Sequence, residues 1–237
     1  MTKESVVSRI GFLNILSILC VLIIYIYTRF LLSKSKEVQY KVIKIQLFFV
    51  LLYNIVIHIV VPTKIPIELS TISYFVVPVI LYFNIKKLHV WAVYAAFTSG
   101  FFYYVSMIIA GDAMYGNFPI YSYSTSLFNH GTLIVYSIIV ARDITFRNKE
   151  IHIIHIGLIL TMVYALLMRP IITHPGRIFI YMILDADLVK DYFFDIKYIM
   201  YPIYYIWLGL YIYFSGYVVF LLNKILIPKE EAKEELQ

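Results

Sequence analysis

A few polar side chains that could do chemistry lie within stretches of sequence that are otherwise apolar. Ser70 and Thr71 begin one stretch, Asn129 and His130 lie inside a second, and His58 lies inside a third. A hydroxyl about 3 Å from an imidazole can lose its proton to the ring as it attacks a carbonyl carbon, and the ring can then protonate the leaving group. Together these residue types indicate transfer or hydrolysis of an acyl group.

The same side chains also have a structural interpretation. Hydroxyls in membrane helices often donate to a backbone carbonyl one turn earlier, so Ser70, Thr71 and Ser73 need no ligand. His130 could bridge two helices, and His58 lies four residues after Asn54, on the same helix face. We keep both interpretations open at this point.

Composition limits the kind of fold that can position these residues. The chain has 237 residues, of which 62% are hydrophobic and only 14% charged, and its mean hydropathy is +0.82. A soluble domain has about 25% charged residues, so these values exclude a water-soluble globular domain. The apolar stretches do not alternate with polar residues and are about 20 residues long, which is the length of a membrane-spanning helix.

We therefore predict an all-α, polytopic membrane helix bundle with about seven transmembrane helices. Residues 10–227 are predicted to form one transmembrane domain, with a short N-terminal tail, 1–9, and a charged tail, 228–237. The first apolar stretch follows Lys3 and Arg9 and resembles a signal sequence, but its length predicts that it is retained as a helix. The predicted spans are Ile10–Leu32, Val42–Val61, Leu69–Ile85, Val90–Ala110, Ser124–Ala141, His152–Met168 and a last one within Tyr198–Leu226.

The distribution of basic residues predicts the orientation of the bundle. Lysine and arginine are concentrated in alternate loops, and such loops are retained in the cytoplasm. This places the N-terminus outside and the C-terminus inside, in a multi-pass protein of the cell membrane. The net charge of +6 then reflects loops that face anionic lipid headgroups rather than nucleic acid.

The predicted spans place the polar residues at similar depths. Measured along each helix from the basic residue at its cytoplasmic end, Ser70 lies at about 24 Å, His130 at about 18 Å and His58 at about 21 Å. The sequence therefore predicts a shared polar pocket in the outer half of the bilayer. In a binding or transport protein, this pocket would hold a small solute through His58, Asn129 and Tyr53. We find no nucleotide-binding loop, so energy for transport would come from a partner subunit or an ion gradient.

Two segments resemble a known family. The run Ile65-Pro66-Ile67-Glu68-Leu69-Ser70-Thr71-Ile72-Ser73, followed about sixty residues later by Phe128-Asn129-His130-Gly131, resembles the YwaF-type integral membrane proteins and their eukaryotic transmembrane phospholipid acyltransferase relatives. Weaker similarities are Tyr181-Met182 and Pro202-Ile203-Tyr204-Tyr205.

The resemblance implies a multi-helix membrane fold and transfer of fatty acyl chains between phospholipids through a cysteine and a histidine. The histidine corresponds to His130, and Ser70 occupies the position of the cysteine. Glu68, which replaces a histidine of the family, could orient the site, and Thr71 is the alternative nucleophile. A serine is a weaker nucleophile than a thiol and needs a firmly placed base. An inactive structural member of the family is the further alternative.

The remaining features predict packing rather than chemistry. Ala92, Ala96 and Gly100 recur every four residues, which is typical of close contact between membrane helices. Cys20 is the only cysteine, so no internal disulfide can form, and we expect no metal or cofactor. Four aspartates between residues 173 and 197 could attract a cation, but an interfacial amphipathic segment is the favoured interpretation.

Overall fold

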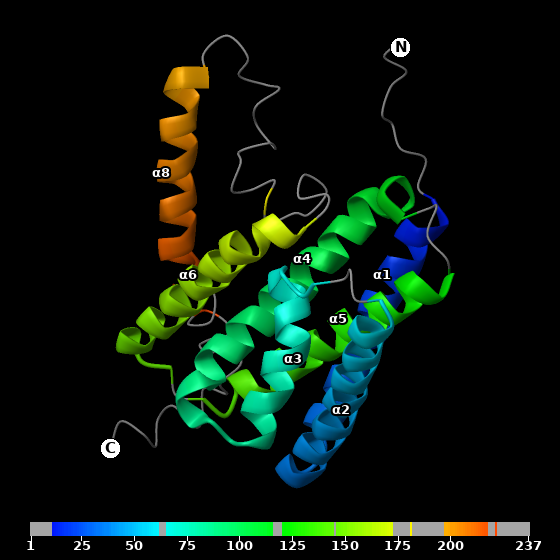
Figure 1. Ribbon diagram of the computed structural model, residues 1–237. Coiled ribbons are helices and arrows are strands. Elements are labelled where there is room, and N and C mark those ends of the chain that lie inside the picture. The colour runs from blue at the N-terminus through cyan, green and yellow to red at the C-terminus, as the bar shows by residue number, and fades with distance from the viewer. Residues whose placement is uncertain are drawn as a thin grey trace.

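The computed structural model describes residues 11–61, 65–115, 120–144, 146–172, 181, 197–217 and 221, and within them the chain is entirely helical. Figure 1 shows the helices packed as a bundle, with no strand in the described residues. The α-helices are α1 Phe12–Leu32, α2 Lys36–Val60, α3 Leu69–Tyr82, α4 His89–Tyr115, α5 Ile120–Ala141, α6 Ile151–Met168 and α8 Lys197–Ser215. Three short 3-10 turns are η1 Lys86–Leu88, η2 Asn148–Glu150 and η3 Arg169–Ile171.

These helices coincide with the predicted apolar stretches, and the prediction of an all-α fold is confirmed. Five of them, α1, α2, α4, α5 and α6, are long and apolar enough to cross a membrane. α3 has 14 residues, or about 21 Å of helix, which is shorter than a typical hydrocarbon core. The fold therefore supports an integral membrane protein with several spans, while the count of seven spans and the direction of the termini stay predictions.

α4 and α5 form the centre of the bundle, and the other helices surround them. In the most apolar 18-residue segment of each helix, 56% of the residues are buried in α4 and 67% in α5. The corresponding values are only 17% in α1 and 22% in α2. The outer helices expose isoleucine, leucine and phenylalanine side chains, as helices in contact with lipid do. Buried polar residues lie on α4 and α5, and also on the buried faces of the outer helices α1 and α2, as Asn14 and Asn54 do.

The small residues of α4 allow it to approach α5 closely. Ala92 and Ala96 are fully buried, and a β-carbon built on Gly100 would lie only 2.8 Å from the backbone oxygen of His130. No side chain fits at that distance unless the backbone moves. The predicted packing role of this stripe is confirmed, and Gly100 fixes the position of His130 relative to α4.

Two polar contacts hold the first turn of α1 against α4. The Asp112 carboxylate accepts a hydrogen bond of 2.9 Å from the backbone N–H of Leu13, and Asn14 donates one of 2.7 Å to the carbonyl of Ile108. A negative charge at the beginning of a helix is favourable because the first N–H groups have no partner within the helix. These contacts attach the beginning of α1, whose later residues line the pocket described below, to α4.

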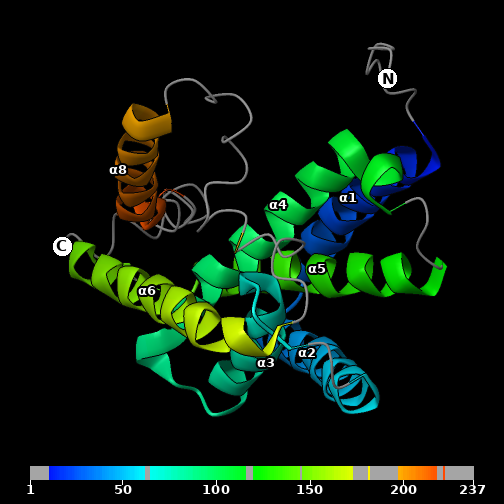
Figure 2. The same ribbon diagram turned by 45° about the horizontal axis from the view of Figure 1, so that its top comes forward.

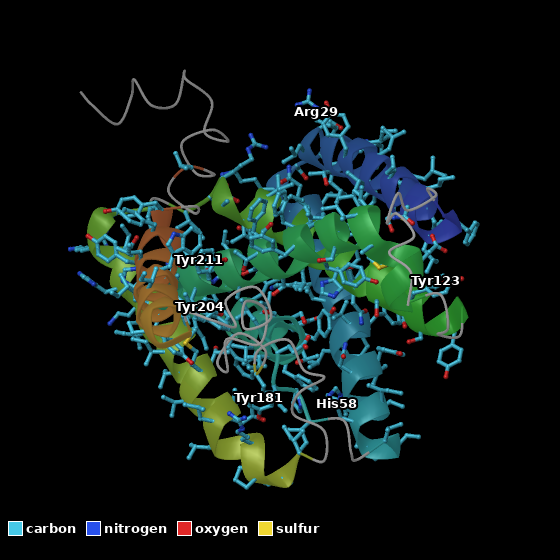
Figure 3. The ribbon with its side chains drawn as sticks, turned by 90° about the horizontal axis from the view of Figure 1, so that it is seen from above. Arg29, His58, Tyr123, Tyr181, Tyr204 and Tyr211 are labelled. Atoms are coloured by element: carbon cyan, nitrogen blue, oxygen red, sulfur yellow. The ribbon has the colours of Figure 1, made fainter. Side chains whose placement is uncertain are left out.

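α6 and α8 lie at the periphery. Figures 1 and 2 show α8 standing at the edge of the bundle, next to α6. Their contact includes a 2.9 Å hydrogen bond between His155 Nε2 and the carbonyl oxygen of Tyr213. In Figure 3, Tyr204 and Tyr211 of α8 lie on the opposite side of the bundle from Tyr123 of α5. The candidate sites below are therefore formed by α1 to α6.

Candidate functional site

His130 is buried where α5 meets α3 and α4. The imidazole stacks on the ring of Tyr103, with 3.8 Å between ring centroids and 7° between planes. The ring of Tyr74, from α3, meets it edge to face at 5.5 Å. Only 6% of His130 is exposed, and its Nδ1 has no hydrogen-bond partner. Aromatic packing and a hydrogen bond to the backbone of Ser99, on α4, therefore orient this imidazole.

The hydroxyls at the beginning of α3 mostly return to their own helix. Thr71 donates to the carbonyl of Glu68 at 2.9 Å, and Ser73 donates to that of Leu69 at 2.6 Å. The structural interpretation of these two hydroxyls is confirmed. Ser70 and Glu68 are half-buried at the same helix end. Between the described residues Ser70 and His130 there is no hydrogen bond, and the α3 side chain that meets the imidazole is Tyr74.

The predicted binding residues contact different neighbours. His58 Nδ1 lies 2.7 Å from the carbonyl oxygen of Asn54 on its own helix, α2, and its ring meets Phe75 edge to face at 5.3 Å. The Tyr53 hydroxyl lies 3.2 Å from that of Thr125 on α5. Asn129 is buried, with 5% of its surface exposed. Figure 3 labels His58 near the end of α2.

A pocket of about 370 Å³ lies between α1, α2 and α5. Its walls are mostly apolar, and none of the seven predicted site residues lines it. Gln46 donates a 2.9 Å hydrogen bond from Nε2 to the Tyr27 hydroxyl, while its Oε1 is buried without a partner. The polar lining residues are Cys20, Tyr27, Gln46, Tyr104, Ser124 and Thr132.

Gly131 lines this pocket, and the absence of a side chain there lets Ile24 and Tyr104 pack close to α5. A β-carbon at this position would lie 3.0 Å from Ile24 Cδ1 and 3.2 Å from the Tyr104 hydroxyl. The Tyr104 hydroxyl itself donates to the carbonyl of Leu127 at 2.8 Å, so it is held in place. The His-Gly step of the sequence thus separates a face of α5 covered by aromatic rings, at His130, from a face that lines the pocket, at Gly131.

Sequence reasoning missed Gln46 because it considered ionisable groups and hydroxyls first. An uncharged amide inside the apolar stretch Val42–Val61 was the available signal, because a polar side chain at membrane depth needs a partner. The described residues contain no group of three histidine, cysteine or acidic side chains placed to hold a metal. The aspartates between 173 and 197 and both predicted tails lie outside the described residues.

Comparison with known proteins adds no relative. No family model, no curated protein and no solved structure matches this chain. The resemblance to the YwaF-type family stays a prediction.

Proposed function

We propose that this integral membrane protein binds an uncharged amphipathic molecule in the pocket between α1, α2 and α5. The observation on which the proposal rests is Gln46, which lines the pocket and whose buried Oε1 has no hydrogen-bond partner among the described residues. A buried acceptor of this kind costs about 1–3 kcal/mol when it is left unpaired. A ligand with a hydroxyl or an amide N–H would supply the missing donor.

The lining limits the chemistry of the ligand. No aspartate, glutamate, lysine or arginine is among the lining residues, so a charged group would enter the pocket without a counter-charge. The Thr132 and Ser124 hydroxyls add polar contacts, and isoleucine, leucine and phenylalanine cover the rest. The volume of about 370 Å³ falls at the small end of the range of ligand sites. These features favour a neutral polar head with a short apolar body.

Cys20 provides a direct test because it is the only cysteine and lines the pocket. We expect 1-decanol to slow alkylation of Cys20 by N-ethylmaleimide in purified protein. Decane lacks the hydroxyl and decanoate is charged. At equal free concentration, each should therefore protect Cys20 from alkylation at least about tenfold less well than 1-decanol does.

The Gln46→Leu variant separates this proposal from general partitioning of decanol into the detergent. It keeps most of the side-chain volume and removes the acceptor, so protection by decanol should weaken about tenfold, corresponding to a lost hydrogen bond of about 1.4 kcal/mol. Tyr53→Phe is the control, because the Tyr53 hydroxyl contacts Thr125 rather than the pocket. If 1-decanol protects Cys20 equally in the wild type, Gln46→Leu and Tyr53→Phe, the proposal is overturned.

A second candidate function is acyl transfer or hydrolysis on membrane lipids by Ser70 and His130. It is supported by the family resemblance and by His130 Nδ1, a buried nitrogen that has no hydrogen-bond partner among the described residues. Ser70 Oγ would attack the ester carbonyl, His130 would take the hydroxyl proton, and the ester C–O bond would break as the ring protonates the leaving alcohol. Water or a lipid hydroxyl would then accept the acyl group from Ser70.

This second function requires α3 to move, because Tyr74 and not Ser70 meets His130. The test is release of a labelled acyl chain from phosphatidylcholine by purified protein. Ser70→Ala and His130→Ala should each abolish release, whereas Thr71→Val should retain it. If Thr71→Val alone abolishes release, Thr71 is the nucleophile. If all variants match the wild type, neither hydroxyl acts.

A further inference from the structure

A second cavity lies on the other side of the bundle, where α6 passes α3 and α4. It is an apolar groove of about 700 Å³. Along α6 it extends from Ile153 to Tyr164, which is about 16 Å of helix, and Pro66 and Ile80 mark its extent on the α3 side. Figures 1 and 2 show α6 running past α3. The groove therefore follows the helices along the expected direction of lipid chains.

Trp91 and Gly157 determine how deep the groove is. The Trp91 side chain packs directly on the backbone of α6 at Gly157, where a β-carbon would overlap the indole ring. Trp91 is only 7% exposed, and its Nε1 is buried without a hydrogen-bond partner. A large apolar ring thus forms part of the groove wall at a point where α6 has no side chain.

The groove ends at a single positive charge. Among the described residues that line the groove, Lys87, in η1, is the only charged one, and it forms no salt bridge with another described residue. Its neighbour Lys86 is also exposed but does not line the groove. An apolar channel with an ammonium group at one end is complementary to an acyl chain with an anionic head.

We propose that this groove binds one acyl chain of an anionic phospholipid, with the lipid phosphate at the Lys87 ammonium group. The site is separate from the pocket that contains Gln46, which α1, α2 and α5 form. In the predicted orientation, Lys87 faces the cytoplasm, so the lipid would come from the cytoplasmic leaflet.

Tryptophan fluorescence can report on this groove alone. The chain has two tryptophans, Trp91 in the groove and Trp207, which is 69% exposed on α8. In the Trp207→Phe protein, lipids with brominated acyl chains quench only Trp91. We expect brominated phosphatidylglycerol to reach half-maximal quenching at about one fifth of the concentration needed for brominated phosphatidylcholine, because one lysine near an anionic lipid contributes about 1 kcal/mol.

Charge variants decide whether Lys87 is the cause. In the Trp207→Phe background, Lys87→Gln should remove the preference for phosphatidylglycerol, whereas Lys86→Gln should retain most of it. The Trp91→Phe protein, which keeps Trp207, should be quenched equally by both lipids. Equal quenching of Trp91 by the two lipids would overturn the proposal. It would also be overturned if Lys86→Gln removed the preference as fully as Lys87→Gln, because the lysines would then attract lipid without a defined site.

Discussion

Two adjacent faces of α5 differ in how completely they are filled. At His130, the rings of Tyr103 and Tyr74 occupy the space between α5, α4 and α3. At Gly131, one residue later, the space between α5, α1 and α2 stays open and forms the pocket next to Gln46. Both regions contain polar atoms without a hydrogen-bond partner, His130 Nδ1 in the first and Gln46 Oε1 in the second. The second lines a pocket of about 370 Å³, whereas aromatic rings cover the imidazole in the first.

The comparison shows that a polar residue at membrane depth is informative only together with the space around it. Histidine is the more conspicuous signal in the sequence because an ionisable group in a membrane is costly. Here the imidazole is packed like an aromatic core residue, whereas an uncharged amide faces a cavity. The following predictions test whether the two faces behave as a packed core and a binding pocket.

The largest effect is expected at the contact between α4 and α5. Gly100→Leu would force atoms into the space taken by the His130 backbone and by Ile134, so the variant should lose about 3 kcal/mol of stability or fail to fold. Gly209→Leu is the matched control, since no atom lies within 4 Å of a β-carbon at that position. Thermal unfolding in detergent measures the stability of both variants. Similar melting temperatures for the two variants would contradict the close contact between the helices.

Replacement of His130 distinguishes packing from chemistry. His130→Phe keeps a ring between Tyr103 and Tyr74 and should change stability by less than about 1.5 kcal/mol. His130→Ala leaves a cavity and should cost about 3 kcal/mol. The same unfolding assay gives both values. A phenylalanine variant as unstable as the alanine variant would mean that the hydrogen bond of the imidazole to the Ser99 backbone, which a phenyl ring cannot make, contributes more to stability than ring packing does.

A smaller effect is expected where α1 is attached to α4. Asp112→Ala removes the acceptor for the Leu13 N–H and should cost about 1 kcal/mol, as the loss of a helix cap does. Asp112→Asn keeps an acceptor oxygen and should cost less. Because this contact holds one wall of the pocket, Asp112→Ala should also speed alkylation of Cys20. Unchanged alkylation would show that the wall does not depend on the contact.

The smallest effect on stability is expected at Gly131. Gly131→Ala crowds Ile24 and Tyr104 by a few tenths of an ångström, and the higher helix propensity of alanine offsets this, so stability should stay within about 1 kcal/mol. The pocket nevertheless becomes smaller, so protection of Cys20 by 1-decanol should weaken. Unaltered protection would place the ligand away from α5.

Much of the fold could be predicted from the sequence because apolar stretches of membrane length leave few alternatives to helices. The close approach of α4 to α5 was predictable from Ala92, Ala96 and Gly100 for the same kind of reason: small residues at helical spacing have a simple geometric meaning. The end of α3 was less predictable. Its apolar stretch continues to Ile85, but the helix ends at Tyr82, just before a turn at Asn84, where φ is +49°.

The arrangement of the site was much less predictable. Depth along a helix placed Ser70, His58 and His130 at similar levels, but the rotation of each helix determines what a side chain contacts. Rotation depends on the packing of neighbours such as Tyr74 and Tyr103, which a single sequence does not specify. Gln46 gave a weak signal because its importance comes from the empty space beside it, and that space depends on Gly131, from another helix.

Binding of radiolabelled 1-decanol to purified protein tests the central claim most directly. We predict saturable binding of about one molecule per chain in the wild type and in His130→Phe, and affinity about tenfold weaker in Gln46→Leu. The account is contradicted if Gln46→Leu binds decanol as tightly as the wild type, or if only His130→Phe loses binding, because the ligand would then occupy the face of α5 that the aromatic rings fill.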